Sequence, residues 1–486
     1  MSSCTPLIAG STVGSRRRHR AGPRTRVRPR GKTGGRPAGG GLKESLARQR
    51  VRRDRQRERR SYKALARDTL SLMSRSEVEA LARTCGFCRR TPRAISAFDF
   101  VVSCAMAAVV EGKRGFASVW RVLAAAAGVE VARSAVTQRF GEGSAKLLEQ
   151  VFVRAVERLP SAPCPEMLGK LERFRSVLAD DGSVLTLSPL LKKLFPATRT
   201  NSVDAAGKVH ATADLVQRRI VHVDFTGERD SELAVARAHP LGAGTLYMSD
   251  LGYTSYDYFA EIKQAQADLL WRLKDNSNPT IVGVRHGVIA PAKVVREGVG
   301  LNDPNLRFAR SYDTFDLDAR FSTKDGSVTL RVVGLFNPAT GKYHCYVTTL
   351  SPDEFSPEEL AALYSLRWVI ELLFKLLKSS CHLDHLDTSD PAALRTHIYA
   401  SLLAATILGS MCHAAASVHG IPVHEISGLM AGIASPMLVM PLMYLWFGCD
   451  LTRERLADSI VAALAIGCRD QNPRRTRAKW GVLALD

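Results

Sequence analysis

The spacing of apolar residues changes twice along the chain. Over residues 61–160 apolar positions recur at helical spacing, and glycines at short intervals mark turns between short helices. Over residues 174–350 short apolar runs alternate with polar residues, which is typical of strands. From residue 351 to 467 the spacing is helical again. The pattern predicts an α/β protein, in which a sheet-containing core is flanked by N-terminal and C-terminal all-α regions.

The first part of the strand-rich region predicts a defined order of elements. A long bent strand or strand pair comes first, followed by two strands, a helix, a strand, a second helix and a final strand. These elements are expected at residues 176–187, 207–215, 218–226, 229–238, 245–249, 255–267 and 269–274. This is the order of an RNase H-like core.

Residues 276–350 are expected to form a β-rich insertion before the last helix of that core. Candidate strands lie at residues 280–284, 307–312, 328–336 and 342–349, and residues 337–341 form a hairpin loop between the last two. Trp271 lies on the strand that enters the insertion. We expect it in the core, and stacking on a displaced base is the alternative.

A single helix is predicted over residues 356–378. Ser356 is a suitable cap, Pro357 suits the first helical position, and Glu359 can bond back to the cap. Five polar residues fall within about 80° of one another around this helix: Tyr364, Arg367, Glu371, Lys375 and Lys378. Nearly all other positions are apolar, which predicts a buried helix. The polar stripe is either a partly exposed face with i,i+4 ion pairs, or a metal-binding carboxylate beside cations that hold phosphates.

Two aspartates could supply further carboxylates to such a site. Asp181 lies within the first strand in the sequence Asp-Gly-Ser, and Asp250 directly follows the strand at 245–249. Asp180 is the rival of Asp181, because adjacent side chains on a strand face opposite sides. Asp250 could instead be a helix N-cap. Three carboxylates from separate elements suit two Mg²⁺ ions roughly 4 Å apart, the arrangement that activates a nucleophile and stabilises the leaving oxygen in phosphodiester chemistry.

The motif Tyr364-x2-Arg367-x3-Glu371-x6-Lys378 resembles the YREK signature of the IS4 family of DDE transposases, which are found in bacterial insertion sequences. The resemblance extends over about residues 61–479. It implies that Tyr364, Arg367 and Lys378 hold the DNA backbone at the cleaved end. Lys375 lies on the same stripe and is expected to assist them.

The sequences around the two aspartates resemble the same family. Asp181 in Asp-Gly-Ser is similar to the box that carries the family's first aspartate, and Asp250 in Asp-Leu-Gly-Tyr is similar to the box of the second. The choice of Asp181 over Asp180 depends on this motif. The resemblance implies that Asp181, Asp250 and Glu371 are the catalytic residues and bind two Mg²⁺ ions, for which Mn²⁺ can substitute.

The resemblance also implies a function. The protein would bind the terminal inverted repeats of an insertion sequence, cleave its ends and transfer the 3′ hydroxyls to target DNA by metal-dependent transesterification. A homodimer in the DNA complex is expected by analogy. Two other functions are compatible with the sequence: a catalytically inactive DNA-binding repressor derived from a mobile element, and an RNase H-fold nuclease without strand transfer.

Charge is concentrated at the N-terminus. Residues 1–60 hold 19 Lys and Arg against three acidic residues, a net +16 of the total +21. This predicts a disordered basic arm over 1–60, solvated or bound to DNA phosphates. The domains expected after it are a helical DNA-end-binding domain (61–165), a catalytic core (170–275 and 351–390) interrupted by the insertion (276–350), and a C-terminal helical region with a basic tail (391–486).

The cysteines and the apolar runs bear on the compartment. Ten cysteines are scattered without a regular framework, and the N-terminus lacks the apolar segment of a secretory signal. We expect a cytoplasmic bacterial protein associated with the nucleoid. The apolar run at 426–448 is interrupted by Pro436 and Pro441, so buried helices are favoured over a membrane span.

Two motifs superficially resemble metal sites. Cys85-Gly-Phe-Cys88 lacks the second pair of ligands that a zinc site requires, which indicates two ordinary cysteines. The motif Cys381-His382-x2-His385 directly follows the polar-striped helix. Its position favours packing or DNA contact over metal binding.

Overall fold

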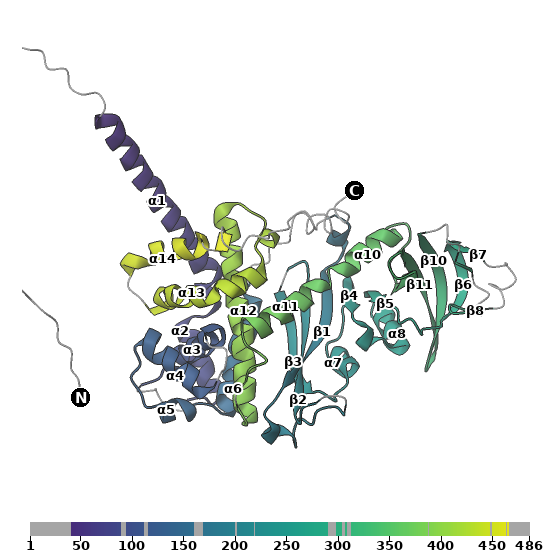
Figure 1. Cartoon of the computed structure of the whole chain (residues 1–486), viewed down its shortest axis with the longest axis horizontal. Helices are drawn as coiled ribbons and strands as arrows, with labels where there is room; N and C mark the ends of the chain where they lie inside the picture. Colours follow the sequence, from purple (N-terminus) through teal and green to yellow (C-terminus); the bar gives the residue numbers. More distant parts are fainter. Residues whose placement is uncertain are drawn as a thin grey trace, which may run out of the picture. The chain divides into compact units, whose positions relative to one another are not determined.

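The computed structural model describes residues 40–88, 94–110, 115–159, 169–199, 202–217, 219–289, 298–303, 307–308, 313–386, 388–447, 450–462 and 464–465. Residues 1–39 of the expected basic arm and the basic tail at 474–479 lie outside the described residues. The chain divides into two compact units, Met1–Arg53 and Asp54–Asp486. The described strands, drawn in teal and green in Figure 1, belong to the second unit. The candidate site residues belong to it as well.

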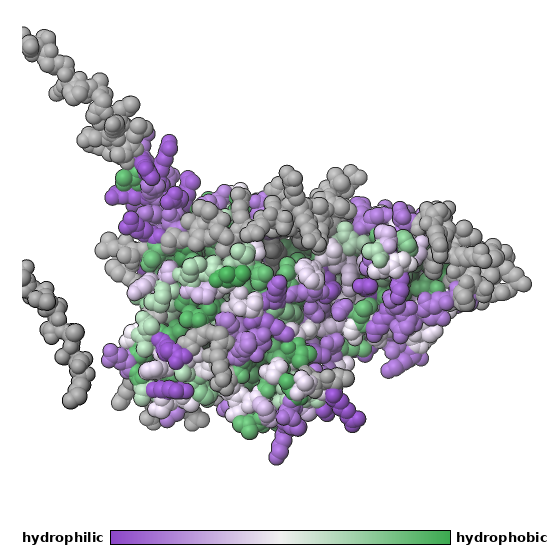
Figure 2. Space-filling view, in the orientation of Figure 1, coloured by the Kyte–Doolittle hydropathy of each residue, from purple (hydrophilic) through white to green (hydrophobic). Residues whose placement is uncertain are grey.

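The expected disordered arm is instead helical over residues 40–60, which form most of α1 (Gly40–Asp68). This segment is rich in Arg, Gln, Glu and Leu, which favour helices, and it contains no Pro. Its C-terminal part is also held by tertiary bonds, because Arg57 (2.9 Å) and Ser61 (2.8 Å) donate to the carboxylate of Asp458. The surface of α1 is mainly hydrophilic (Figure 2).

Further helices precede and follow the sheet in the sequence. They are α2 (Arg75–Thr84), α3 (Ala97–Val110), α4 (Phe116–Ala127), α5 (Arg133–Thr137), α6 (Glu142–Glu157), α12 (Pro391–His419), α13 (Gly428–Phe447) and α14 (Asp450–Ala462). Helix α12 packs on α3 and α6. The hydroxyls of Ser144 and Thr396 lie 2.9 Å apart across α6 and α12, and Tyr399 donates to Glu149 at 3.1 Å. Helices from both ends of the sequence therefore share one core, and the domain boundaries stay a prediction.

Two of these helices, α12 and α13, are long and apolar enough to cross a membrane by length and composition. In α12, 78% of the most apolar window is buried inside the protein, compared with 44% in α13. Pro436 and Pro441 were expected to interrupt the second apolar run, but both lie inside α13. The apolar surface of α12 is mostly packed against other helices of the protein, as in a core helix.

The central strands follow the predicted order. They are β1 (Ser176–Thr186), β2 (Ala206–Asp214), β3 (Arg219–Gly227), β4 (Thr245–Ser249) and β5 (Asp268–Arg272), with α7 (Glu232–Ala238) and α8 (Tyr256–Gln264) between them. In space the order is β3-β2-β1-β4-β5. Strands β1, β4 and β5 are parallel, while β2 and β3 are antiparallel to their neighbours. The long first strand is continuous and lies in the middle of this group.

The insertion continues the same sheet. Its strands are β6 (Thr280–His286), β8 (Val299–Gly300), β10 (Thr314–Thr323), β11 (Gly326–Asn337) and β12 (Lys342–Thr348), and a separate pair is formed by β7 (Val288–Ile289) and β9 (Arg307–Phe308). Strand β12 pairs antiparallel with β5, so ten described strands form one sheet. The sequence did not predict β10. This strand contains Asp316 and Asp318, a residue type that disfavours strands unless tertiary partners neutralise it.

The two faces of the sheet contribute to different cores. Along β4, Leu246 and Met248 belong to the core that includes α11 and α12, whereas Tyr247 belongs to the core that includes α8. Trp271 is completely buried in the second core and contacts the rings of Tyr247 and Phe259. A buried indole cannot stack on a displaced base, so the core assignment of Trp271 holds.

The predicted single helix is divided into α10 (Pro357–Ser365) and α11 (Trp368–Ser379). Leu366 and Arg367 between them keep right-handed helical dihedrals, but the backbone bonds there span three residues, as from Arg367 N to Tyr364 O (3.1 Å). This local 3₁₀ winding changes the angular position of α11 residues relative to α10. The helix is also less buried than expected, because Trp368 is 54% exposed and Leu372 is 40% exposed.

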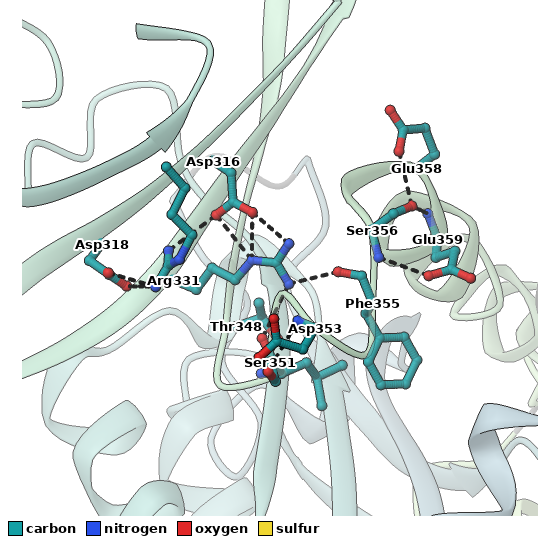
Figure 3. Close-up of polar contacts among 12 residues, drawn as sticks. Asp316, Asp318, Arg331, Thr348, Ser351, Asp353, Phe355, Ser356, Glu358 and Glu359 are labelled. Atoms are coloured by element: carbon teal, nitrogen blue, oxygen red, sulfur yellow. Dashed lines mark hydrogen bonds and ion pairs between the residues drawn. The ribbon is translucent and has the colours of Figure 1, made fainter.

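A buried arginine connects the insertion to the start of α10 (Figure 3). Arg331 of β11 is paired with Asp316 of β10 at 2.7 Å, and both side chains are less than 10% exposed. The same guanidinium donates to the backbone carbonyls of Phe355 (2.8 Å) and Leu350 (3.3 Å), just before α10. Ser356 then caps α10 with Glu359 in the predicted capping box. Arg331 therefore fixes where the helical segment with the polar stripe begins.

Removing this guanidinium should destabilise the fold strongly. In Arg331→Met, Asp316 loses its buried partner, and two carbonyls lose a donor. We expect the free energy of unfolding to fall by about 3 kcal/mol in urea denaturation. The matched control is Lys192→Met in the exposed pair Lys192–Asp204 (2.6 Å), for which we expect a change below about 1 kcal/mol. Equal effects of the two substitutions would contradict the importance of the buried pair.

Candidate active site

Asp181 lies at the centre of β1, on the strand that contacts α11. Its Oδ1 accepts a hydrogen bond from the backbone N–H of Gly182 at 2.9 Å. Burial raises the pKa of Asp181 to about 6, and the N–H of Gly182 and the charge of Arg367 oppose this increase. The charges of Glu371 and Asp250 raise the pKa further. The three carboxylates of the predicted site are therefore near enough to interact electrostatically.

Asp180 faces the other side of β1. Tyr247 donates a hydrogen bond to its Oδ2, and its Oδ1 has no partner among the described residues. Burial raises the pKa of Asp180 to about 6. The carboxylate lines a cavity of about 290 Å³ together with Thr212, His222, His239 and Tyr247. The aspartate whose charge interacts with Asp250 and Glu371 is Asp181.

Asp250 occupies the turn at the end of β4. It is the residue before the 3₁₀ helix η5 (Leu251–Tyr253), but its side chain makes no capping bond there. The N-cap alternative therefore fails for its carboxylate. The preceding residue, Ser249, accepts a hydrogen bond through its carbonyl from the buried hydroxyl of Tyr364 at 3.2 Å. This bond connects α10 to the turn that carries Asp250.

Glu371 lies in the first turn of α11 and is paired with Arg367, four residues earlier. The Arg367 side chain is only 12% exposed, and its guanidinium carbon lies 5.6 Å from the centre of the Tyr364 ring. Nε of Arg367 is buried without a hydrogen-bond partner among the described residues. The i,i+4 pair considered from the sequence is thus present, and it lies beside Asp181 and Asp250, whose charges also interact with Arg367.

The two lysines of the stripe have different environments. Lys378 is partly buried, and its Nζ donates to the carbonyl of Val184 near the end of β1 at 2.9 Å. Lys375 is exposed. The structure therefore places Lys378 against the strand that carries Asp181 and leaves Lys375 accessible to solvent.

The donor atoms around Asp181 suit a hard divalent cation, because carboxylate oxygens are the ligands that Mg²⁺ prefers. Among the described residues, no group of three His, Cys, Asp or Glu side chains is close enough to hold a metal ion. The ion pair with Arg367 occupies one oxygen of Glu371. The residue types of the three side chains are those of a divalent-metal site, and Glu371 is paired with Arg367 in this structure.

The sequence did not identify three other residues beside the carboxylates. Glu232 at the start of α7 is paired with Lys208 of β2 at 2.8 Å. The hydroxyl of Tyr253 in η5 is buried without a hydrogen-bond partner among the described residues, and burial and nearby carboxylates raise its pKa. A signal was present in the glycines next to the aspartates, Gly182 and Gly252, because glycine permits another group to approach the backbone closely.

The other candidate metal motifs do not assemble a site in the described part of the chain. Cys85 and Cys88 are free thiols at the end of α2. Cys381 is buried, and the rings of His382 and His385 are 6.5 Å apart. Neither motif belongs to a described group of three possible ligands.

A substitution of Asp181 can test whether its pKa is raised in the folded protein. The folded pKa of about 6 exceeds the usual unfolded value of about 3.9, so the wild type loses stability as pH rises between these values. We expect Asp181→Asn to be more stable than wild type by on the order of 2 kcal/mol at pH 8, with the difference vanishing as pH falls through 6 towards 4. Urea denaturation in EDTA across this range measures it. Parallel pH profiles of the two proteins would contradict the raised pKa.

Comparison with known proteins places these residues in a recognised domain. The family model described as a transposase DDE domain matches residues 172–407, nearly half of the chain. This range includes Asp181, Asp250 and Glu371, together with the cations beside Glu371.

Several curated proteins that are similar to this chain are named as transposases. The transposase of IS231F from Bacillus thuringiensis subsp. israelensis is 22% identical over 68% of this chain and 76% of its own length. The transposase of IS1151 from Clostridium perfringens is 20% identical over 60% of this chain and 68% of its own. The putative transposase InsL of IS186A from Escherichia coli (strain K12) is 48% identical over 62 residues, so the chain spans only 17% of that relative. The matched domain contains the carboxylates of β1, β4 and α11, and over this domain the chain is similar to the DDE transposases.

Proposed function

We propose that this protein is the transposase of an insertion sequence and that Asp181, Asp250 and Glu371 carry its catalysis. The observation that supports this most is the electrostatic interaction of Asp181 with both other carboxylates, which come from elements 69 and more residues away in the sequence. Close carboxylates repel one another, so their convergence is costly without a function that uses it. The core that carries them is proposed to be RNase H-like, with helical regions on either side of it in the sequence.

The proposed reaction depends on divalent cations. Asp181, Asp250 and Glu371 would hold them, with Mg²⁺ as the proposed ion and Mn²⁺ as a substitute. When bound, such ions lower the pKa of a nucleophilic water or 3′-hydroxyl and stabilise the leaving oxygen. Deprotonated carboxylates are needed as ligands, so the raised pKa of Asp181 predicts weaker ion binding below pH 6.

The cations beside Glu371 are proposed to hold DNA phosphates. Arg367 is partly desolvated, which strengthens its interaction with an anion. Lys375 is exposed on the next turn of α11, and Lys378 is anchored to β1. The hydroxyl of Tyr364 is engaged by Ser249, so its proposed contribution to the DNA site is through its ring and through the position of Arg367.

The proposed substrates are the terminal inverted repeats of the element and a target duplex. Cleavage would expose 3′ hydroxyls, which then attack target phosphodiesters by transesterification, so one bond forms for each bond broken. The exposed arginines of α1 support additional contacts with phosphates, which carry no sequence information. In this proposal two subunits act on the two ends of the element. The protein would work in the cytoplasm, at the bacterial nucleoid.

One observation favours a second candidate. The Arg367–Glu371 ion pair engages one carboxylate oxygen, and a chain in which metal does not displace Arg367 would be a catalytically inactive DNA-binding product of a mobile element. The two functions differ in their response to metal, since a repressor would bind the inverted repeats without cutting them.

Removal of the Glu371 charge tests the proposal. We expect Glu371→Gln to abolish Mg²⁺-dependent cleavage of a duplex carrying the flanking inverted repeat, because a neutral amide is a poor ligand. Its affinity for that duplex should remain within about threefold of wild type. The matched control is Glu261→Gln in the surface pair Arg237–Glu261, which should cleave normally. Cleavage by Glu371→Gln would refute the catalytic assignment, and binding without cleavage by the wild type would favour the repressor.

A further inference from the structure

The carboxylate of Glu232 lies against two glycines that adjoin the proposed catalytic aspartates. A Cβ added to Gly252, two residues after Asp250, would overlap Oε2 of Glu232. A Cβ added to Gly182, next to Asp181, would lie 3.3 Å from Oε1 of the same carboxylate. One carboxylate thus occupies the space beside both glycines.

Glu232 is held in this position from two directions. Ser231 caps α7 by accepting a hydrogen bond from Ala234 N, which fixes Glu232 in the first helical turn. Lys208 of β2 donates to Oε1 at 2.8 Å, and the two side chains are 13% and 25% exposed. The ion pair neutralises a carboxylate that would otherwise add repulsion beside Asp181 and Asp250.

A side chain packed beside Gly182 can influence the Asp181 carboxylate through the backbone of Gly182. The N–H of Gly182 donates to Oδ1 of Asp181 at 2.9 Å, so the orientation of this peptide influences the orientation of the carboxylate. Lys208 Cδ lies 3.2 Å from a Cβ built on Gly182, and Tyr253 Oη lies 3.5 Å from it. Strand β2, helix α7 and the turn η5 therefore converge on this one residue.

We infer that Glu232, paired with Lys208, is a positioning residue that sets the spacing and orientation of Asp181 and Asp250. It acts through Gly182 and Gly252 and does not itself bind the metal. This inference rests on the proposed function of the two aspartates. Groups that orient metal ligands in this way affect metal affinity by about 10- to 100-fold.

The experiment measures metal binding directly, separately from activity. Mn²⁺ is titrated calorimetrically into the full-length protein as wild type, Glu232→Gln and Gly252→Ala. Glu232→Gln keeps the side-chain size and removes the charge paired with Lys208, whereas Gly252→Ala displaces the carboxylate from the other side. We expect both to weaken Mn²⁺ binding by about tenfold and to raise the Mn²⁺ concentration for half-maximal cleavage by the same factor. Cleavage at saturating Mn²⁺ should recover.

One control variant and three possible outcomes make the test decisive. Glu261→Gln, in the surface pair with Arg237, should bind Mn²⁺ like wild type. Wild-type Mn²⁺ affinity in both Glu232→Gln and Gly252→Ala would overturn the inference while leaving the proposed function intact. Complete loss of binding and of cleavage at every Mn²⁺ concentration in folded Glu232→Gln would make Glu232 a ligand and overturn the positioning role. A wild-type protein that binds no Mn²⁺, with Asp181→Asn indistinguishable from it, would overturn both proposals.

Discussion

The organisation of the protein depends on the cost of holding negative charges together near a partly dehydrated strand. Asp181 on β1 interacts with Asp250 and Glu371, and burial alone already disfavours its charged form. Such a group persists only if surrounding cations and hydrogen-bond donors compensate it. Arg367 supplies charge from the α11 side, and the N–H of Gly182 supplies a hydrogen bond from the backbone. The cluster is therefore poised to gain stability when a cation binds.

The compensation extends to residues that do not contact the carboxylates directly. The Lys208–Glu232 pair occupies the space that glycines leave beside both aspartates. On the other side, Tyr364 bonds the carbonyl before Asp250, and Lys378 bonds a carbonyl of β1. Helix α10 is thus attached to β4, and helix α11 is attached to β1. These bonds limit how far the three carboxylates can move apart when all three are negatively charged.

The β insertion contributes to the same constraint. Because β12 pairs with β5, the inserted strands extend the sheet that carries the site. The buried Arg331–Asp316 pair then contacts the carbonyls that precede α10. A long insertion in the sequence therefore does not leave Glu371 loosely connected to β1, since the polypeptide returns to the core through bonds made by its own last strands.

The sequence by itself determined the order of the central strands and helices and the capping box at Ser356, because these depend on local periodicity and side-chain type. Tertiary structure decided what local pattern does not encode. The face of β1 occupied by Asp181 depends on which side α11 covers. The end of α10 is held by a bond from Tyr364 to the carbonyl of Ser249 on the distant strand β4. Strand β10 exists because Arg331 and Arg285 neutralise its aspartates. The contact of Glu232 with two glycines joins three segments, and only their folding together brings it about.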